Sequence, residues 1–300
     1  MSFASKTSGP SAADPYASDT WTFFEGEWHP GNVRMMGPRT HGAWLGSTVF
    51  DGARAFEGTT PDLDRHLARV NRSAEALGLS AKVGVADWAG LVADGLARFA
   101  PRSELYIRPM YWAESGFGGG VRFDPDSTNW CLSIYTAPMP APTGVKATLS
   151  CFRRPSIETA PVDAKAGCLY PNGARALTEA LSRGFGNCLM LDGLGNVAEF
   201  ANANAFLARD GVVFTPVANG SFLAGITRAR VIGLLRGDGC EVVEKTLSYA
   251  DFLAADEVFT AGNFAKVAPV TGLDGVRFEA GPVFRRAREL YWAFAHDRAA

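Results

Sequence analysis

The sequence predicts an α+β protein of two domains, and three observations support this fold class. The chain has 300 residues, of which 47% are hydrophobic and 20% charged, so it is long enough for two separate cores. Segments with the spacing of amphipathic helices lie among short runs typical of strands. A proline-rich linker, 138–144, separates a small N-terminal domain, 21–137, from a larger C-terminal domain, 145–300.

Charge and hydropathy exclude several classes of function. A formal net charge of -2 argues against a nucleic-acid partner. No apolar run is long enough to span a membrane and no signal peptide is recognisable, so we expect a cytoplasmic protein without a membrane partner. Residues 1–20 are rich in Ser, Ala, Pro and Gly, which is typical of a flexible arm. The five cysteines have no CxxC spacing and therefore predict no structural metal site.

The N-terminal domain is expected to combine an antiparallel sheet with helices. Its strand-like segments are 21–24, 47–56, 104–112 and 131–136, and its helix-like segments are 63–77 and 88–99. Gly52, inside one strand-like run, would let a ligand or another backbone approach closely. Asp62 or Asp64 is predicted to cap the helix over 63–77.

The C-terminal domain alternates between the two kinds of element. A helix is predicted from an apolar stripe at Ala174, Leu177, Ala180 and Leu181. Further helices are expected at 223–232 and 282–297, and strands at 188–191, 212–215 and 255–270, the last of them ending in a polar loop.

Lys165 lies in a run of small residues just before the first of these helices, an unusual place for a solvating lysine. Desolvation disfavours the charged form of a cramped lysine, and the neutral amine is the nucleophile that forms imines. Pyridoxal phosphate (PLP) uses such an amine, and it also needs a carboxylate at its ring nitrogen and donors for its phosphate. Lys165 and Glu199 suit the first two roles. Alternatively, they are a surface lysine and a hairpin carboxylate, and these two residues alone do not decide between the interpretations.

Other residues are candidates for binding an anion or lining a pocket. The run Gly225-Ile226-Thr227 opens a helix, where free backbone N–H groups favour an anion, although such a start also occurs without a ligand. Arg69 lies beside the apolar stripe of its helix, so it either points inward at an anion or snorkels at the helix edge. Tyr106 and Arg108 share one face of a strand and could line a pocket.

Taken together, the motifs of the chain resemble those of the class IV aminotransferases, which are the fold-type IV PLP enzymes. The likeness is greatest to the branched-chain amino acid aminotransferases, and the motifs follow the family's order from about Phe23 to the C-terminus. They are Arg69 in His-x-x-Arg, Tyr106-x-Arg108-Pro109, Lys165 with Tyr170, Glu199, Gly225-Ile226-Thr227-Arg228, and Asp256-Glu257-Val258-Phe259 followed by Gly262 and Pro269-Val270.

The resemblance implies a fold, a cofactor and a reaction. The fold is an N-terminal α/β sandwich and a C-terminal β-barrel-like domain with helices, with PLP in the cleft between them. The reaction is transfer of the amino group of a branched-chain or other hydrophobic amino acid to a 2-oxo acid, with 2-oxoglutarate as the expected acceptor. Family members are homodimers or larger, so we expect a homo-oligomer.

The resemblance also implies roles for individual residues. Lys165 is expected to form the Schiff base and to move the substrate proton, Glu199 to hold the pyridine nitrogen, and Tyr170 to bond the ring oxygen. Five residues are expected to bind the phosphate or cover the ring: Arg69, Leu223, Ile226, Thr227 and Asn263. Four are expected to line the substrate side: Phe50, Tyr106, Arg108 and Phe264. In the family, the arginine can receive the distal carboxylate of glutamate.

Three departures from the family pattern bear on substrate specificity. Asp51 replaces the glutamate of a Phe-Glu-Gly-x-Arg motif, Leu45 replaces an upstream aromatic residue, and Asn263 replaces a threonine aimed at the phosphate. An asparagine can still donate a hydrogen bond there. Alternatives on the same scaffold are a D-amino acid transaminase, an (R)-amine transaminase and an aminodeoxychorismate lyase. An alternative of another class is a binding protein that keeps the fold without catalysis.

Overall fold

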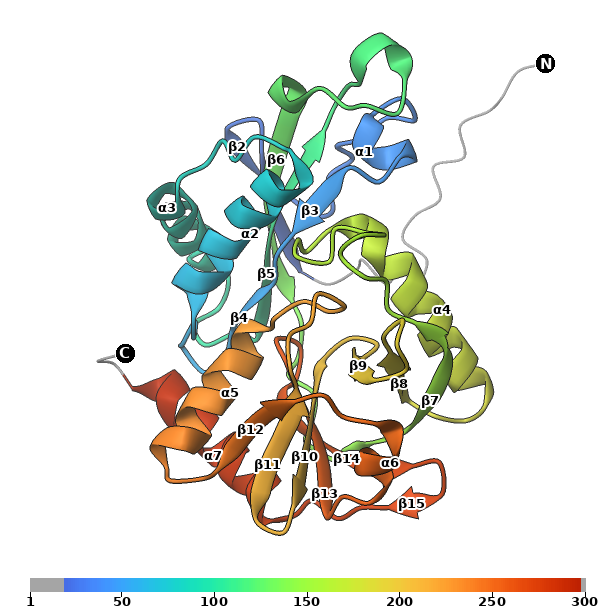
Figure 1. The fold of residues 1–300 in the computed structure, drawn as a ribbon. Helices are drawn as coiled ribbons and strands as arrows, with labels where there is room; N and C mark the ends of the chain where they lie inside the picture. The colour runs from blue at the N-terminus through green and yellow to red at the C-terminus, as the bar shows by residue number, and fades with distance from the viewer. Residues whose placement is uncertain (1–18, 298–300) are drawn as a thin grey trace, which may run out of the picture.

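A computed structural model of the protein describes residues 19–297, in which two sheets lie one above the other (Figure 1). The upper sheet has six strands in the order β2-β1-β6-β5-β3, with β4 also pairing with β5, and every pair is antiparallel. Its strands are β1 (Thr20–Phe24), β2 (Glu27–Pro30), β3 (Thr48–Phe50), β4 (Ala53–Ala55), β5 (Leu105–Ala113) and β6 (Thr128–Thr136).

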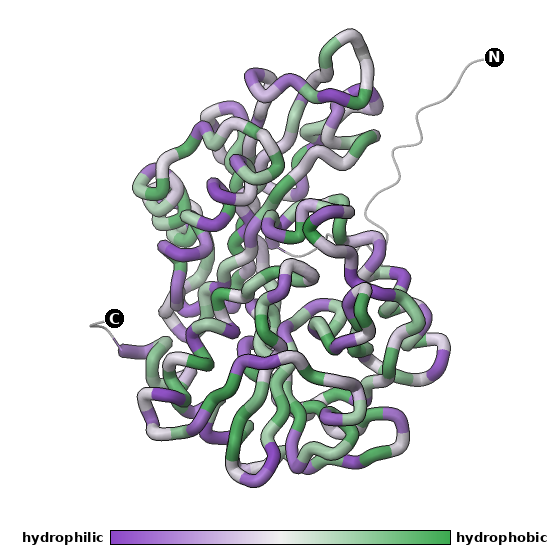
Figure 2. Tube along the Cα trace, viewed as in Figure 1, coloured by the Kyte–Doolittle hydropathy of each residue, from purple (hydrophilic) through white to green (hydrophobic). Residues whose placement is uncertain are grey.

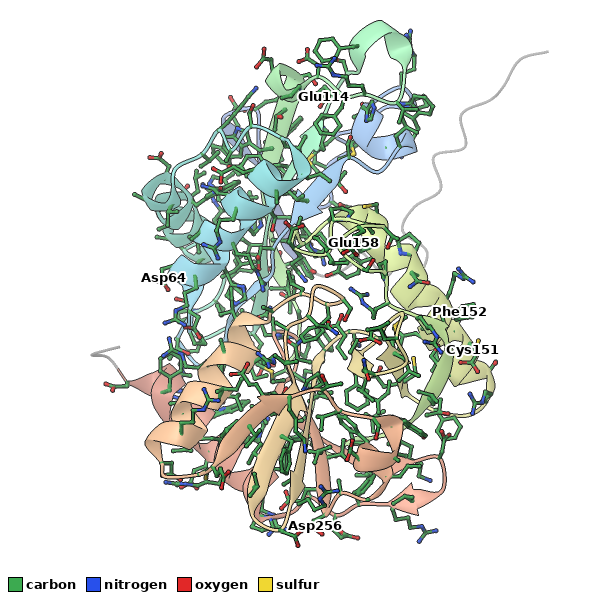
Figure 3. The ribbon with its side chains drawn as sticks, viewed as in Figure 1. Asp64, Glu114, Cys151, Phe152, Glu158 and Asp256 are labelled. Atoms are coloured by element: carbon green, nitrogen blue, oxygen red, sulfur yellow. The ribbon has the colours of Figure 1, made fainter. Side chains whose placement is uncertain are left out.

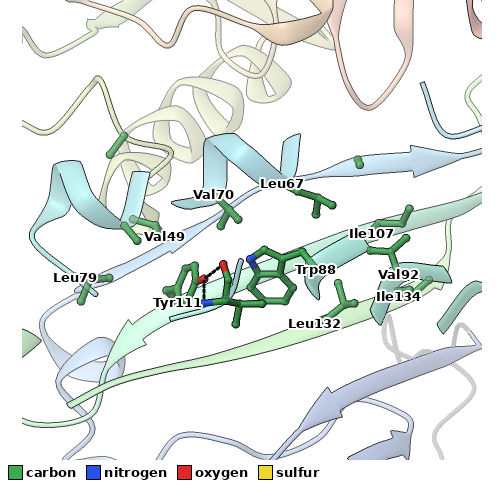
Figure 4. Close-up of a cluster of buried hydrophobic side chains, with 14 of the residues drawn as sticks. Val49, Leu67, Val70, Leu79, Trp88, Val92, Ile107, Tyr111, Leu132 and Ile134 are labelled. Carbon is green, nitrogen blue, oxygen red and sulfur yellow. Dashed lines mark hydrogen bonds between the residues drawn. The ribbon is translucent and has the colours of Figure 1, made fainter. Parts of the chain in front are cut away.

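Two helices, α2 (Leu63–Leu77) and α3 (Val85–Leu96), pack on this sheet and close the first core. The stripe of α2 is buried completely at Leu67 and Val70, as its spacing predicted, and the helix has the predicted bounds. Figure 4 shows these side chains above Tyr111 and Trp88, both fully buried. Short turns of helix complete the region: α1 (His41–Trp44), η1 (Phe117–Gly119) and η2 (Pro125–Ser127).

The lower sheet has nine strands and curls into a half-barrel. Their order is β12-β11-β10-β13-β14-β7-β8-β9, with β15 on β14; β11–β12, β14–β7 and β7–β8 are parallel pairs. The strands are β7 (Val145–Arg153), β8 (Asn187–Leu191), β9 (Val197–Phe200), β10 (Asn204–Arg209), β11 (Val212–Pro216), β12 (Val242–Lys245), β13 (Glu257–Gly262), β14 (Lys266–Leu273) and β15 (Val276–Arg277).

Helices flank the lower sheet on two sides, which confirms the predicted α+β class (Figure 1). Helices α5 and α7 pack against each other and against β13 and β14, whereas α4 packs on β7 and β8. Figure 2 shows hydrophobic segments through the middle of both sheets and hydrophilic ones in outer loops. The helical elements are η3 (Gly167–Leu169), α4 (Tyr170–Ser182), α5 (Ile226–Gly237), α6 (Tyr249–Leu253) and α7 (Pro282–His296).

Several predicted details are wrong, each for a physical reason. The segment 255–270 holds two antiparallel strands, β13 and β14, because the chain reverses at Asn263 inside what looks like one apolar run. Leu181 is 62% exposed, since α4 buries its small residues against the sheet instead. The run 26–28 is expected from the sequence to be the turn after the first strand, but the chain already turns at Gly26 and Trp28 belongs to β2.

The predicted side-chain cap of α2 is also wrong. Asp62 occupies the N-cap position, but its carboxylate forms an ion pair with Arg230 of α5 and caps no backbone N–H. Asp64 lies on the outer surface of the helix (Figure 3). The Asp62 ion pair therefore ties α2 to α5, the helix that begins at Ile226.

The connection between the sheets runs from the end of β6 at Thr136 to the start of β7 at Val145. The predicted linker, 138–144, lies within it, and the division into two domains there stays a prediction. The predicted arm, 1–20, lies almost wholly outside the described residues. Over the described range, the structure contains no helix with the length and apolar character needed to cross a membrane.

Candidate active site

One cavity of about 760 Å³ brings the predicted site residues together. Its walls come from β3, α2 and β5 of the upper sheet region and from β9, α5 and the β13–β14 turn of the lower one. All twelve residues predicted for the site line it: Phe50, Arg69, Tyr106, Arg108, Lys165, Tyr170, Glu199, Leu223, Ile226, Thr227, Asn263 and Phe264. Leu45, one of the three departures, is not among the lining residues.

The backbone of Lys165 is bonded to β3 and α2 of the upper sheet region. Its carbonyl accepts from the Phe50 N–H at 3.1 Å, and its own N–H donates to the Ser73 hydroxyl at 3.0 Å. Its neighbours Ala164 and Ala166 are fully buried, so the small residues noted in the sequence do make a cramped setting. The Lys165 backbone is therefore fixed while its side chain reaches the cavity.

The Lys165 side chain lies among aromatic rings. Its Nζ donates to the Tyr170 hydroxyl at 2.5 Å and is 5.0 Å from the centre of the Phe50 ring. Burial lowers the pKa of Lys165; Asp51 opposes this shift and Arg69 adds to it. Burial, together with nearby Glu199, raises the pKa of Tyr170 to about 12, so its hydroxyl stays protonated. A neutral nucleophilic amine beside a protonated phenol is thus accessible at this position.

Glu199 lies on β9 and is buried at the lower side of the cavity. Its Oε1 is 3.2 Å from Nε of Arg154, and its Oε2 accepts from Nδ2 of Asn204 at 3.2 Å. Burial raises the pKa of Glu199 to about 7, although Arg154 and Lys165 oppose the shift. A further cation, such as a protonated ring nitrogen, would favour the carboxylate form.

Arg69 points into the protein and does not snorkel. Its Nε and Nη2 donate to the two oxygens of Asp51 at 2.6 and 2.9 Å, and His66 bonds the same carboxylate at 2.7 Å. Burial opposes ionisation of Asp51, but Arg69 and His66 together hold its pKa well below the usual range. Since a guanidinium has five N–H groups, Arg69 keeps donors for an anion in the cavity.

The start of α5 faces the same cavity at Ile226 and Thr227. The first N–H groups of a helix have no partner within the helix, and its dipole favours an anion there. Gly225 precedes them, and a Cβ on Gly225 would lie 2.0 Å from Oδ1 of Asn204, so only glycine fits this approach. Asn204 in turn donates to the Leu223 carbonyl at 3.2 Å, which connects this loop to Glu199.

Asn263, in the turn between β13 and β14, has a side-chain amide whose hydrogen bonding points to a bound ligand. Its Oδ1 accepts from Nζ of Lys266 at 2.6 Å. Its Nδ2 is buried and has no hydrogen-bond partner among the described residues. An unpaired buried donor is costly, so a ligand with acceptor oxygens is expected beside it. With Arg69 and the α5 start, this donor set fits a phosphate.

Arg108 lies on the substrate side among three aromatic rings. The ring centres of Phe50, Tyr106 and Tyr135 are 5.8, 5.2 and 5.1 Å from its guanidinium carbon. One Nη donates to the Tyr135 hydroxyl, whereas Nε is buried without a partner among the described residues. Gly52 makes room here, because a Cβ at that position would lie 1.9 Å from the Tyr106 hydroxyl.

Some residues of the site were missed from the sequence, and one motif has a different place. Arg154 and Tyr135 were not predicted, since their partners are distant in sequence. Asn204 was not predicted either, although it lies five residues from Glu199. In the Asp256-Glu257 motif, Asp256 lies at the far end of the lower sheet (Figure 3). Glu257 accepts from two N–H groups at the start of α7. The Asp256-Glu257 motif therefore has a structural role.

Comparisons with known proteins agree with this geometry. The family model described as amino-transferase class IV matches residues 48–273. The branched-chain-amino-acid aminotransferase of Salmonella typhimurium is 30% identical over 288 residues, which cover 91% of this chain and 92% of the relative. That of Escherichia coli is 30% identical over 287 residues, with the same coverage.

Solved structures extend the likeness to three dimensions. A crystal structure of an aminotransferase from Brucella abortus bound to PLP has a TM-score of 0.91 and 53% identity, and the match covers 93% of this chain and 99% of that one. The branched-chain aminotransferase of Escherichia coli gives 0.85 and 27%, with coverage of 94% and 97%. The chain belongs to the class IV aminotransferases. It is a PLP-dependent transaminase similar to the branched-chain enzymes.

Proposed function

We propose that the protein transfers the amino group of a branched-chain or other hydrophobic amino acid to 2-oxoglutarate. The observation that carries this proposal is Arg108 among the rings of Phe50, Tyr106 and Tyr135. Such a site offers apolar surface to a hydrophobic side chain and a cation to a distal carboxylate. The names of the relatives from Salmonella typhimurium and Escherichia coli support the same donor class.

Lys165 is the proposed catalytic base. Bound PLP supplies an aldehyde that joins the substrate amine and a protonated ring that withdraws electrons from the substrate Cα. Because its pKa is lowered by burial, the Lys165 amine can take the proton from Cα and return it to the product. Tyr170 accepts a hydrogen bond from this amine and so fixes its direction. The small residues beside Lys165, Ala164 and Ala166, are themselves fully buried.

Glu199 is proposed to hold the protonated ring nitrogen. Arg154 and Asn204 each bond one of its oxygens, so the carboxylate cannot rotate freely. At the other end, Arg69, Ile226, Thr227 and Asn263 are proposed to hold the phosphate, and Leu223 to cover one face of the ring. These roles place the ring between a carboxylate and a donor-rich cradle.

We also propose that two copies of the chain associate. Three large apolar side chains near the top of the upper sheet are strongly exposed: Trp44 at 54%, Phe117 at 49% and Val121 at 80%. Their segments meet at His41, whose ring contacts Trp44 and bonds the Val121 carbonyl. A second copy would cover this apolar surface. Light scattering across a dilution series should give twice the chain mass, and a monomer at all concentrations would contradict the proposal.

Substrate choice is tested by measuring the two half-reactions separately. L-leucine, L-valine, L-glutamate, D-alanine and (R)-1-phenylethylamine are each mixed with the PLP form, and the absorbance change of the cofactor is followed. Fast conversion by the first three supports the proposal, whereas preference for either of the last two identifies the corresponding alternative enzyme.

Arg108→Leu sharpens this test. Removing the cation should raise the KM for 2-oxoglutarate and glutamate about tenfold to a hundredfold, because their distal carboxylate loses its partner, and should change the leucine half-reaction much less. An equal loss for both substrates would mean that Arg108 serves the α-carboxylate or the structure.

A further inference from the structure

Lys266 is the first residue of β14. It is buried, and burying a lysine side chain is energetically unfavourable. Its side chain is 1% exposed and forms no ion pair within the described part of the chain. Its neighbours include the rings of Phe56 and Tyr291, 6.0 and 5.7 Å from Nζ. Burying an unpaired cation is unfavourable, and the backbone φ of +59° is one that glycine adopts more readily. The two rings lie within cation–π distance of the amine, but its one hydrogen-bond partner among the described residues is an amide oxygen.

Among residues 19–297 the Lys266 amine makes one hydrogen bond, and this bond leads to the cavity. Nζ donates to Oδ1 of Asn263 at 2.6 Å, three residues away across the β13–β14 turn. Lys266 itself is not among the lining residues of the cavity, whereas Asn263 is. Within the described part of the chain, the Asn263 amide is thus the hydrogen-bonding link from Lys266 to the lining of the cavity.

This contact fixes which end of the amide faces the cavity. Burial, followed by the charge of Arg54, lowers the pKa of Lys266 to about 7, while Asp62 opposes the shift. Below neutrality the ammonium form predominates, and it offers only donors. The Asn263 amide must then present its oxygen to Lys266 and its Nδ2 to the other side. That Nδ2 is the buried donor without a partner.

We propose that Lys266 is a positioning residue that orients the amide of Asn263, so that Nδ2 donates to the phosphate of PLP. The inference rests on the proposed role of Asn263 in phosphate binding. Without Lys266, the amide is free to rotate and can turn its oxygen toward the phosphate, where the two acceptors repel each other. The lysine acts through the asparagine and touches no reacting atom.

A double-mutant cycle on cofactor affinity tests this. The apoproteins of the wild type, Lys266→Met, Asn263→Ala and the double variant are titrated with PLP at about pH 6, where the ammonium form predominates. Pyridoxal, which lacks the phosphate, is the matched control ligand. We expect each single variant to bind PLP about tenfold more weakly, the double variant to bind no more weakly than Asn263→Ala, and pyridoxal binding to stay unchanged.

The outcomes separate the two proposals. Unchanged PLP affinity in Asn263→Ala overturns the role of Asn263, and the positioning role with it. Weakened binding in Asn263→Ala but not in Lys266→Met overturns the role of Lys266 alone. Additive losses, or equal losses for PLP and pyridoxal, would show a structural effect of the lysine.

A second variant keeps the test decisive if Lys266→Met does not fold, as checked by thermal unfolding of the apoprotein. Lys266→Gln retains a donor and should keep part of the PLP affinity in the wild-type background, with no effect in the Asn263→Ala background. An effect of equal size in both backgrounds would contradict the positioning role.

Discussion

Two lysines of this protein have lowered pKa values, and they differ in what surrounds the amine. Lys165 lines the cavity, donates to Tyr170 and has Glu199 near enough to affect its pKa. Lys266 is buried at the β13–β14 turn. Its amine bonds the amide of Asn263 and lies near the rings of Phe56 and Tyr291. Burial is the first cause of the shift in both. Of these two lysines, Lys165 is the one that combines a lowered pKa with a place in the cavity and with a phenol and a carboxylate nearby, which suits it to the proposed role of nucleophile.

The largest difference between the two lysines should appear on removal of Lys165. Lys165→Ala is expected to lower the rate of transamination at least about a thousandfold, because both the covalent attachment point and the proton carrier are lost. Thermal unfolding should show an intact fold, and Lys82→Ala, at an exposed lysine that donates to the Asp126 carbonyl, is the matched control. Substantial turnover by Lys165→Ala without an added amine would contradict the account.

The polar groups near Lys165 can then be replaced one at a time, beginning with Glu199. Glu199→Gln keeps the size of the side chain but removes the charge that holds the ring nitrogen protonated. The single-turnover rate at saturating PLP should fall about a hundredfold, since an electrostatic partner of the electron-withdrawing ring is lost. If the rate stays within a few-fold of the wild type, Glu199 does not act on the ring.

Tyr170→Phe removes one hydroxyl and leaves the ring against Phe50. The Lys165 amine loses its 2.5 Å hydrogen bond, so its direction is less fixed. A loss of about tenfold in the half-reaction rate is expected, which is the effect of one hydrogen bond. A loss as large as that of Lys165→Ala would give Tyr170 a chemical role beyond orientation.

The smallest expected effect is on the pH dependence of stability, in which Lys266 should differ from a lysine with an ordinary pKa. Its pKa is about 7 when folded and rises to about 10.4 when the chain unfolds, so the unfolded state binds more protons between these values. Stability of the wild-type apoprotein should therefore rise with pH across this range through Lys266. Lys266→Met should unfold at a higher temperature than the wild type near pH 7, and this advantage should shrink towards pH 10. A difference that is constant with pH would contradict the lowered pKa.

Sequence reasoning worked where the signal is local. The helix over 63–77 was predicted with its observed bounds because its apolar stripe is regular and Leu67 and Val70 are large. The prediction for α4 failed at Leu181, since that helix packs through glycine and alanine, which leave only a weak hydrophobic pattern. Lys165 is singled out in the sequence by its small neighbours, which the structure shows buried, and its catalytic role stays a prediction.

The partners of the site residues depend on contacts that no local pattern encodes. Arg154 reaches Glu199 from the residue just after β7, and Tyr135 reaches Arg108 from the neighbouring strand β6. Asp51 was noted only as a departure from the family motif, yet it pairs with both His66 and Arg69. Lys266 did leave a signal, because a lysine between alanine and valine in a buried strand is unusual.

Identifying the lysine that carries the cofactor distinguishes Lys165 from Lys266 in a single experiment. The PLP-loaded protein is reduced with borohydride and digested, and the peptides are weighed. Our account requires the added mass of the reduced cofactor on Lys165, with loss of the yellow colour, and none on Lys266. Attachment to Lys266 or to any other lysine, or no attachment at all, would contradict it.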